Sequence, residues 1–526
     1  MDIVDNNVNT NKYINFNNQR HVSLSNNIAY WLKLNTKFIN KKNKSIINKY
    51  KKILNQKDIN TLIKCIRYNI NTLPILYQLN DDNIHLLLNE AFKYINIHMI
   101  KLINNFIKID NKLIIKHMLA FCKHGHLNIV KYLQKEIGLK LIEEYFQSNN
   151  NYACQQACHF GHLNVVKYLH KEIGLTKDNF QLFDNYAFVM TYPNGHINVV
   201  KYLHRKIKLL KQDFQSVNNK ACQLACENGN IDVIKYLHQE IGLTKDDFQS
   251  NNNYACRWAC HNGHLNVVKY LHQEVKLTKD DFQSNNKACY TFCIEGHLKI
   301  VKYLHQEVKL LKEDFQLNNN EIIRHVCSRG YINIVKYLHK EIGLTKEDFQ
   351  SNNNEACRST CLKGHIEVVK YLHKEIGLTK QDFQSNINQT CKDACYYGHL
   401  DVVKYLHQEI ELTKEDFQYY NNYACRMACY GGYFDVVKYL HQEIKLTKKD
   451  FQSEDNEACR LACEKGHIDI VKYLHREIGL TKPDFQSNKN YAREFACYNN
   501  HVDVVKYLHW EINIIIKPQY FPAVLC

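Results

Sequence analysis

The stretch that decides the fold is NYACRWACHNGHLNVVKYLHQEVKLTKDDF, residues 253–282. Its Lys-Tyr-Leu tripeptide recurs along the chain, with the tyrosine at positions 132, 168, 202, 236, 270, 303, 337, 371, 405, 439, 473 and 507. The spacings are 36, 34, 34, 34 and 33, followed by 34 six times. A fixed period of this length is typical of stacked supersecondary units. We therefore predict an all-α solenoid of twelve clear repeats of about 34 residues.

The first half of the repeat carries small residues at helical spacing. Ala255, Cys256, Ala259 and Cys260 would lie on one face of a short first helix and let a neighbouring helix approach closely. Gly263 follows, and glycine fills this position in eleven of the twelve copies, with Asn500 as the exception. We expect the glycine to end the first helix in a left-handed turn.

The second half of the repeat predicts a second helix and a further turn. The second helix has an apolar stripe formed by Leu265, Val267, Val268 and Leu271. After it, Thr278 and Asp281 have the spacing of a capping box and predict another helical turn, which Phe282 would anchor to the stack. The residues expected to cap the first helix of the next copy are Ser284, Asn285 and Asn286.

The middle of this unit resembles the ankyrin repeat. The Ala-Ala-x-x-Gly-His-x-x-Val-Val-x-x-Leu part of the ankyrin pattern is seen here as Ala259-Cys260-His261-Asn262-Gly263-His264-Leu265-Asn266-Val267-Val268-Lys269-Tyr270-Leu271. The first half departs, since Tyr254-Ala255-Cys256-Arg257 stands where the family has Thr-Pro-Leu-His. A Thr-Lys-x-Asp-Phe turn stands in place of the family's β-hairpin tip. The Lys-Tyr-Leu-His variant in an Asn-rich background is similar to ankyrin-repeat proteins encoded by giant amoeba-infecting DNA viruses of the mimivirus type.

The array does not extend over the whole chain. We predict a basic, Asn/Lys-rich and partly disordered segment at residues 1–55, up to two degenerate repeats at 56–116, the repeat array at 117–513 and a short tail at 514–526. Residues 1–120 hold 18 Lys and Arg against 7 Asp and Glu, whereas the remaining 406 residues hold 51 against 46. The basic character of the chain therefore belongs to its first part, and nucleic-acid binding by the array is not expected.

The cysteines and histidines could be interpreted as metal ligands. Eight copies contain Cys-x-x-x-Cys followed by a histidine in most cases, as in Cys256, Cys260 and His264. We favour packing, because both positions belong to the core of the ankyrin pattern and a free cysteine behaves as a small hydrophobic residue. A histidine follows Lys-Tyr-Leu in eleven copies, and we interpret it as a residue of the outer face rather than a pH sensor or ligand. The histidine after the glycine resembles the structural histidine of the family.

The unbroken lysine column, Lys131 to Lys506, is interpreted as a solvated outer face. In five copies an aspartate stands three residues before this lysine, where helical pairing would offset the charge. The aspartates are Asp232, Asp401, Asp435, Asp469 and Asp503.

Binding residues are expected where the sequence varies within the fixed repeat. Two residues between the second cysteine and the glycine vary from copy to copy, at the end of the first helix, where ankyrin proteins commonly contact their targets on the concave side. Drift at exposed sites is the alternative explanation. The predicted protein-binding residues are His159, Phe160, His261, Asn262, Ser328, Arg329, Leu362, Lys363, Tyr396, Tyr397, Tyr430, Glu464 and Lys465.

The resulting hypothesis is a protein-binding scaffold. No phosphate loop, paired carboxylates or nucleophile motif stands out, so we expect no catalysis, cofactor or metal. We expect a monomer with a protein partner from a host cell, located in the cytoplasm or nucleus, because the sequence lacks a signal peptide and a membrane-spanning run. The alternative is a nuclear-targeted or nucleic-acid-associated factor acting through the basic cluster of Lys37, Lys41, Lys42, Lys44, Lys49, Lys51 and Lys52.

Overall fold

The computed structural model describes residues 91, 100, 120–137, 152–181, 189, 191–283, 293 and 295–515. The chain divides into two compact units, Met1–Ala221 and Cys222–Cys526. Helices joined by short turns make up the described part of the chain, which contains no β-strand. The predicted division into residues 1–55 and 56–116 lies outside the described residues, apart from Ala91 and Ile100, which are buried in helix.

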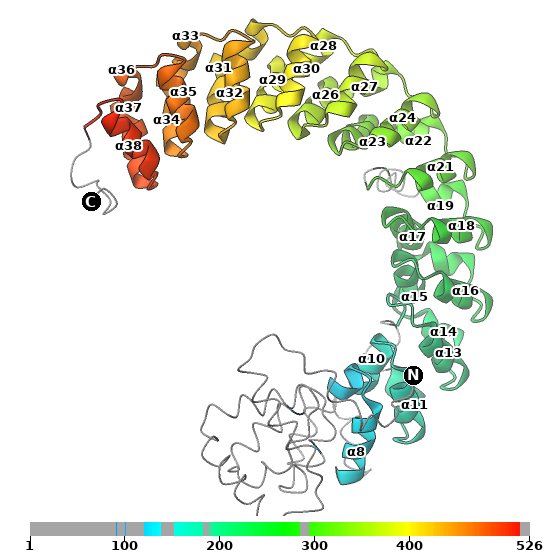
Figure 1. Ribbon diagram of the computed structural model, residues 1–526. Helices are drawn as coiled ribbons and strands as arrows, with labels where there is room; N and C mark the ends of the chain where they lie inside the picture. The colour runs from blue at the N-terminus through cyan, green and yellow to red at the C-terminus, as the bar shows by residue number, and fades with distance from the viewer. Residues whose placement is uncertain are drawn as a thin grey trace, which may run out of the picture. The chain divides into compact units, whose positions relative to one another are not determined.

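A fully described repeat contains a first helix, a second helix and a short third one (Figure 1), whereas the last repeat has no short helix in its described residues, 487–515. The first helices are α10 (Tyr152–His159), α15 (Ser216–Glu227), α17 (Lys245–His261), α23 (Leu317–Ser328), α26 (Ser351–Lys363), α29 (Ser385–Tyr396), α31 (Lys414–Gly431), α34 (Ser453–Glu464) and α37 (Ser487–Tyr498). The bounds of α17 and α31 also include the short helix of the preceding repeat, which left-handed residues separate from the first helix, at 251–253 in α17 and at 420–422 in α31.

The second helices are short and nearly identical in length. They are α8 (Leu127–Ile137), α11 (Leu163–Lys171), α13 (Ile197–Arg205), α16 (Ile231–Gln239), α18 (Leu265–Gln273), α21 (Leu298–Gln306), α24 (Ile332–Lys340), α27 (Ile366–Lys374), α30 (Leu400–Gln408), α32 (Phe434–Gln442), α35 (Ile468–Arg476) and α38 (Val502–Trp510). The separate short helices are α14 (Lys211–Phe214), α19 (Lys279–Gln283), α22 (Lys312–Phe315), α25 (Lys346–Phe349), α28 (Lys380–Phe383), α33 (Lys448–Phe451) and α36 (Lys482–Phe485).

The core lies between neighbouring helices along the stack. Within Cys222–Cys526 the first helices pack against one another in the order α23, α26, α29, α31, α34 and α37, and each packs on its own second helix. The repeat of α26 and α27 shows the pattern, because Cys357, Cys361, Val369 and Leu372 are all fully buried. Figure 1 shows α17 and α23 on the inner side of this unit's curve, with α18 and α24 outside them. One face of each first helix therefore packs in the core, and the opposite face is turned to solvent on the inner side of the curve.

Glycine sets the spacing between successive repeats. Gly364 ends α26 in the left-handed region, with φ of 73°, as predicted for this position. A Cβ atom added to Gly364 would lie 2.4 Å from the ring of His399 in the next repeat. The same histidine bonds through Nε2 to the backbone carbonyl of Leu362, at 3.0 Å. Two constraints therefore require glycine here, the backbone turn and the close ring.

The Thr-Lys-x-Asp-Phe turn forms a capped short helix, as the sequence predicted. At α25, the backbone N–H of Thr345 donates to Asp348 Oδ2 at 2.8 Å. The previous repeat adds Gln316, whose Nε2 donates to Asp348 Oδ1 at 2.7 Å, and Lys312, whose Nζ lies 3.6 Å from Oδ2. Phe349 is fully buried. Because capping and cross-repeat contacts meet on one carboxylate, the turn also joins adjacent repeats.

Three consecutive left-handed residues join the short helix to the next first helix, which the sequence did not predict. At the start of α26 they are Asn352, Asn353 and Asn354, with φ of 52°, 56° and 57°. Asparagine tolerates this conformation better than other non-glycine residues. The predicted caps Ser284, Asn285 and Asn286 lie outside the described residues, but in the described copies the equivalent asparagines form this turn instead.

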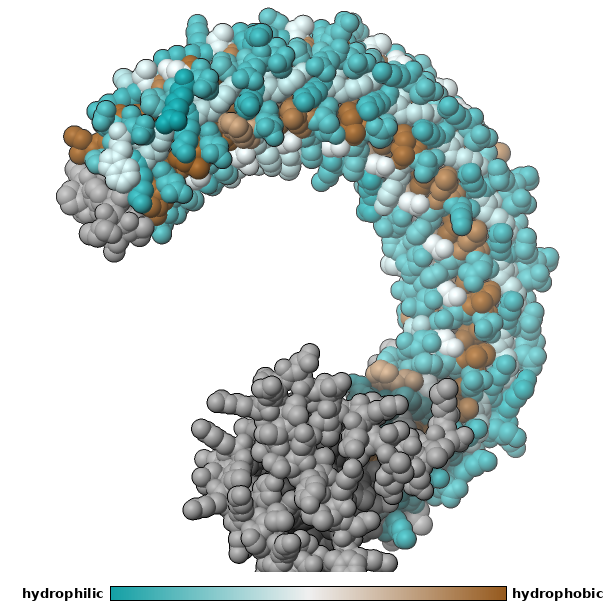
Figure 2. All heavy atoms as spheres, in the orientation of Figure 1, coloured by the Kyte–Doolittle hydropathy of each residue, from teal (hydrophilic) through white to brown (hydrophobic). Residues whose placement is uncertain are grey.

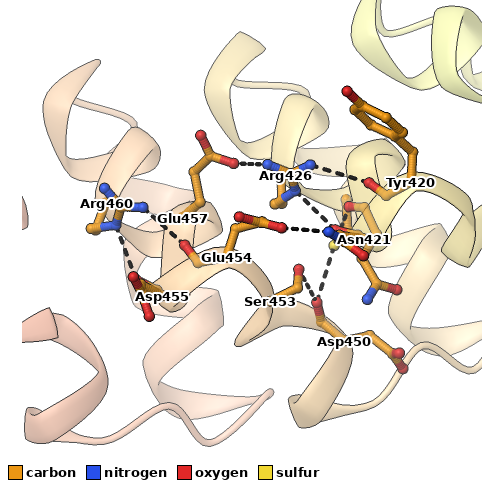
Figure 3. A network of polar contacts seen from close by, with 11 residues as sticks. Tyr420, Asn421, Arg426, Asp450, Ser453, Glu454, Asp455, Glu457 and Arg460 are labelled. Carbon is orange, nitrogen blue, oxygen red and sulfur yellow. Dashed lines mark hydrogen bonds and ion pairs between the residues drawn. The ribbon is translucent and has the colours of Figure 1, made fainter. Parts of the chain in front are cut away.

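An arginine on the first helix closes the left-handed turn. In α31, Arg426 donates from Nε to the carbonyl of Asn421 at 3.0 Å and from Nη2 to that of Tyr420 at 3.2 Å (Figure 3). Its Nη1 bonds to Glu457 of the next repeat. Arg460 repeats the carbonyl contacts one repeat further along. The carbonyl groups exposed by the unusual backbone are satisfied in this way.

Substitution of Gly364 should separate the two constraints. Gly377→Ala would cost only the strain of a left-handed alanine, because Gly377 has φ of 79° and no neighbour within 4 Å of its Cβ position. Gly364→Ala would cost the same strain and a clash with the ring of His399 as well. We expect Gly377→Ala to cost about 1–2 kcal/mol and Gly364→Ala about 1–3 kcal/mol more. Hydrogen exchange over residues 351–399 would measure the local opening free energy. Equal effects of the two variants would argue against the ring contact.

Ile387 is a poor residue for the left-handed turn before the helical part of α29. It has φ of 65° and is 53% exposed, so its β-branched side chain gains little burial in return for the strained backbone. We expect Ile387→Asn to stabilise this repeat by about 1 kcal/mol and Asn353→Ile to destabilise its own repeat by a similar amount. Hydrogen exchange over residues 380–397 and 346–363 would test both, and no change in either variant would contradict the assignment.

Candidate functional site

We call the repeated residues that join successive repeats the frame. The histidine after Lys-Tyr-Leu belongs to it, which corrects its interpretation as an outer-face residue. His373 Nδ1 lies 3.1 Å from the hydroxyl of Tyr405 in the next repeat, and its ring meets Phe383 edge to face at 6.3 Å. The same bond recurs along the stack, with at least nine histidine–tyrosine pairs in the described residues. Because the tyrosine belongs to the following repeat, each bond ties two repeats together.

The other repeated polar residues are also engaged in the frame. The histidine after the glycine bonds to a carbonyl of the previous repeat, as His264 does with Glu227 at 2.9 Å. At least five lysines of the lysine column lie over tyrosine rings of the next repeat, as Lys302 does over Tyr337 at 5.5 Å. The sequence predicted that this lysine pairs with an aspartate three residues earlier, and no described copy has that pair. The one ion pair at this spacing in the described second helices joins Lys370 to a glutamate, Glu367.

The cysteines pack in the core, as the sequence analysis favoured. Every described cysteine is buried except the half-buried Cys497. Burial raises the pKa of the Cys256 and Cys425 thiols to about 12, so they remain protonated near neutral pH. No group of three or more His, Cys, Asp or Glu residues is placed to hold a metal ion in the part of the chain that the structure describes.

The predicted binding residues lie at the ends of the first helices. In each pair the first residue is half-buried, and the second is exposed in every predicted copy except that of Lys465, which is half-buried. Several make contacts across repeats: Arg329 pairs with Glu295 at 3.3 Å, and Lys465 lies 4.8 Å above the ring of Tyr430. Asn262 donates to the carbonyl of Glu227 at 2.6 Å. Within Cys222–Cys526, such contacts therefore link predicted residues to neighbouring repeats.

Two further columns extend this set of residues, and the sequence analysis missed them. In α17, Tyr254, Trp258 and His261 occupy positions i, i+4 and i+7. The ring centroid of Trp258 lies 5.5 Å from that of Tyr254 and 4.8 Å from that of His261. In α37, Tyr491 stacks on Phe495 at 3.9 Å. The signal was available, because the residues two before and two after the first cysteine position also vary. We name the three positions together the first-helix stripe.

The members of the first-helix stripe share helical spacing and exposure to solvent. They are Tyr254, Trp258 and His261 of α17, Glu321, His325 and Ser328 of α23, Glu355, Ser359 and Leu362 of α26, Gln389, Asp393 and Tyr396 of α29, Tyr423, Met427 and Tyr430 of α31, Glu457, Leu461 and Glu464 of α34, and Tyr491, Phe495 and Tyr498 of α37. All are half-buried except the exposed Phe495 and Tyr498.

The surface is mixed in character. On the face shown in Figure 2, Cys222–Cys526 is mostly hydrophilic, with small hydrophobic spots that recur along the stack. No described helix is long and apolar enough to cross a membrane. The aromatic members of the first-helix stripe are of the type that contributes most to protein interfaces.

The fold defines a helical-repeat solenoid whose fixed residues build a frame and whose variable residues share one face. A family model of three ankyrin repeats matches residues 155–249, 186–283, 223–314, 257–348, 322–416 and 423–517, which together make up more than half of the chain. The chain therefore belongs to the ankyrin-repeat family, whose repeats generally mediate protein–protein interaction. No curated protein matched the sequence.

The half-buried histidines should make the array sensitive to acid. Burial, with Lys374 nearby, lowers the pKa of His373, and burial lowers the pKa of the equivalent histidines. Because the unfolded chain, with histidine pKa near 6.5, binds protons more readily than the folded one, stability is fully present above about pH 6.5. It is lost as the pH falls from there through the lower folded pKa.

We therefore expect the urea midpoint to fall between pH 7.5 and 5.5. Replacing His339, His373 and His407 by glutamine, the residue found at Gln134, should reduce this dependence on pH. An unchanged or rising midpoint on acidification would contradict the assignment.

Proposed function

We propose that the chain is a non-catalytic scaffold that binds a protein partner through the first-helix stripe and the residue pairs at its end. The observation that carries this proposal is that the frame engages the repeated residues, whereas the variable ones share an exposed face. Variation confined to one face is the pattern expected if the frame is kept for stability and the face for recognition.

The chemistry of the stripe supports protein recognition. Tyrosine, tryptophan and arginine are enriched among residues that dominate binding energy, and Tyr254, Trp258, Arg329 and Tyr430 are of these types. Their positions on packed helices limit the conformational entropy lost on binding. A stack of repeats also offers a long surface, which suits an extended partner.

The partner is proposed to be a host protein, met in the cytoplasm or nucleus by a monomer of this chain. This part of the proposal rests on the similarity of the Lys-Tyr-Leu-His repeat to viral ankyrin-repeat proteins. The alternative function of the basic cluster at residues 37–52 concerns residues outside those described. The nearly balanced charge of residues 121–526, with 51 basic against 46 acidic residues, favours the protein-binding proposal.

Charge reversal on the two faces would test which one binds. The full-length chain carrying Arg329→Glu, Lys363→Glu and Lys465→Glu would be used to capture proteins from a host lysate. The matched control carries Lys299→Glu, Lys449→Glu and Lys472→Glu, which are exposed residues of second and short helices with the same change in charge. We expect the first variant to lose most of the proteins captured by the wild type and the control to retain them.

Circular dichroism and thermal midpoints would establish that both variants fold. Loss of the captured proteins in the control alone, or in neither variant, would refute binding through the first helices. Recovery of DNA in place of protein, weakened by salt, would support the alternative function.

A further inference from the structure

Five tyrosines gather on and beside the first-helix stripe at α29 and α31. Tyr396 contacts Tyr397 at 4.7 Å, and its ring lies nearly parallel to those of Tyr423 and Tyr430, both at 6.4 Å between centroids. Tyr420 meets Tyr423 at 6.0 Å. Because these rings come from two helices and a left-handed turn, they form one patch, which we call the tyrosine cluster.

The tyrosine cluster is open to solvent at its edges. Tyr397 is 46% exposed and Tyr420 is 66% exposed. Tyr420 also occupies a left-handed position with φ of 58°, where most copies have asparagine. An exposed aromatic group at a strained position gains nothing for the frame, and grouped exposed aromatic residues mark binding surfaces.

The charge around the tyrosine cluster is positive on the side of α26 and α29. Residues 351–363, 385–397 and 419–431 carry the four cations Arg358, Lys363, Lys392 and Arg426 against the two carboxylates Glu355 and Asp393. Glu355 pairs with Arg324, and Arg426 pairs with Glu457 of the next repeat, whose turn also places Glu454 beside Asn421. Among the described residues, Arg358, Lys363 and Lys392 form no ion pair.

Lys392 is the most unusual of these cations. It is only 9% exposed, and its Nζ lies 5.3 Å above the ring of Tyr420. The equivalent Arg358, Arg426 and Arg460 donate to carbonyls of the left-handed turn. Lys392 makes no such bond, and burial lowers its pKa. The neighbouring carboxylate of Asp393 offsets this burial only in part, so an anionic group brought by a ligand would further stabilise the charged form of Lys392.

We propose that the tyrosine cluster and Lys392 bind an acidic segment of the partner protein, with apolar side chains on the tyrosine rings and separate carboxylates on Lys392 and Lys363. This inference rests on the proposed function and names the chemistry of the partner at one part of the surface. Aromatic rings favour apolar or proline side chains, and the unpaired cations exclude a basic segment by repulsion. The charge and the aromatic surface therefore select the same kind of peptide.

Selection from a random library of 12-residue peptides displayed on phage, with the immobilised full-length chain as target, would test this. We expect the wild type to enrich peptides that combine Asp or Glu with aromatic, leucine or proline residues. The cluster variant carries Tyr397→Ser and Tyr420→Asn, the second of which restores the asparagine of other copies. It should lose this enrichment, whereas a variant with Tyr254→Ser and Trp258→Ser on α17 should keep it.

One enriched peptide, labelled with fluorescein, would then be titrated by fluorescence anisotropy. We expect the cluster variant and Lys392→Gln each to weaken binding by roughly tenfold, because each removes a central contact. Raising the salt concentration should weaken binding to the wild type, as expected for paired charges. Circular dichroism and thermal midpoints would establish that the variants fold.

The possible outcomes separate this inference from the proposed function. No enrichment, or enrichment of neutral or basic peptides, would overturn the inference. Acidic peptides that still bind the cluster variant but not the α17 variant would also overturn it, while leaving binding through the first helices intact. If the charge reversals of the first-helix face leave lysate capture unchanged, the proposed function fails regardless of the peptides selected.

Discussion

The contact between a glycine and the histidine ring of the next repeat determines how closely the repeats stack. At Gly364 the absent side chain leaves room for His399, and the left-handed turn places the carbonyl of Leu362 within reach of the same ring. The other contacts across repeats form at the distance between repeats that this contact sets. The histidine–tyrosine bonds and the aspartate of each short helix join residues about 32 positions apart, so they can form only when adjacent repeats are in register.

Much of the fold could be predicted from the sequence because its signals are local. Helical spacing indicated the core cysteines and valines, and Thr278 and Asp281 predicted a capped turn that the structure contains. The left-handed turn was missed because asparagine before a helix is equally typical of a cap. The bond of His373 to Tyr405 was missed because columns in a sequence do not show which of them face each other across repeats.

The candidate site was predicted in part for a related reason. The variable pair next to each glycine is conspicuous because fixed residues flank it, and so Tyr396 and Tyr430 were identified. Tyr423 and Trp258 were missed because they stand among residues that vary for several reasons, and only the helical geometry places them in one stripe. The cations without partners could not be found from the sequence at all, since their pairing depends on distances between repeats.

The buried cysteines give each repeat a reporter of its own opening. A thiol with a raised pKa and no exposed surface cannot react with a thiol reagent while its repeat is closed. Reaction therefore requires local unfolding, and the rate of modification at each cysteine measures how often that repeat opens. Because cysteines occur in nearly every described copy, the chain carries an ordered series of such reporters from one end of the stack to the other. Mass spectrometry of the modified thiols could thus reveal which repeats open first and whether opening begins at the ends of the stack.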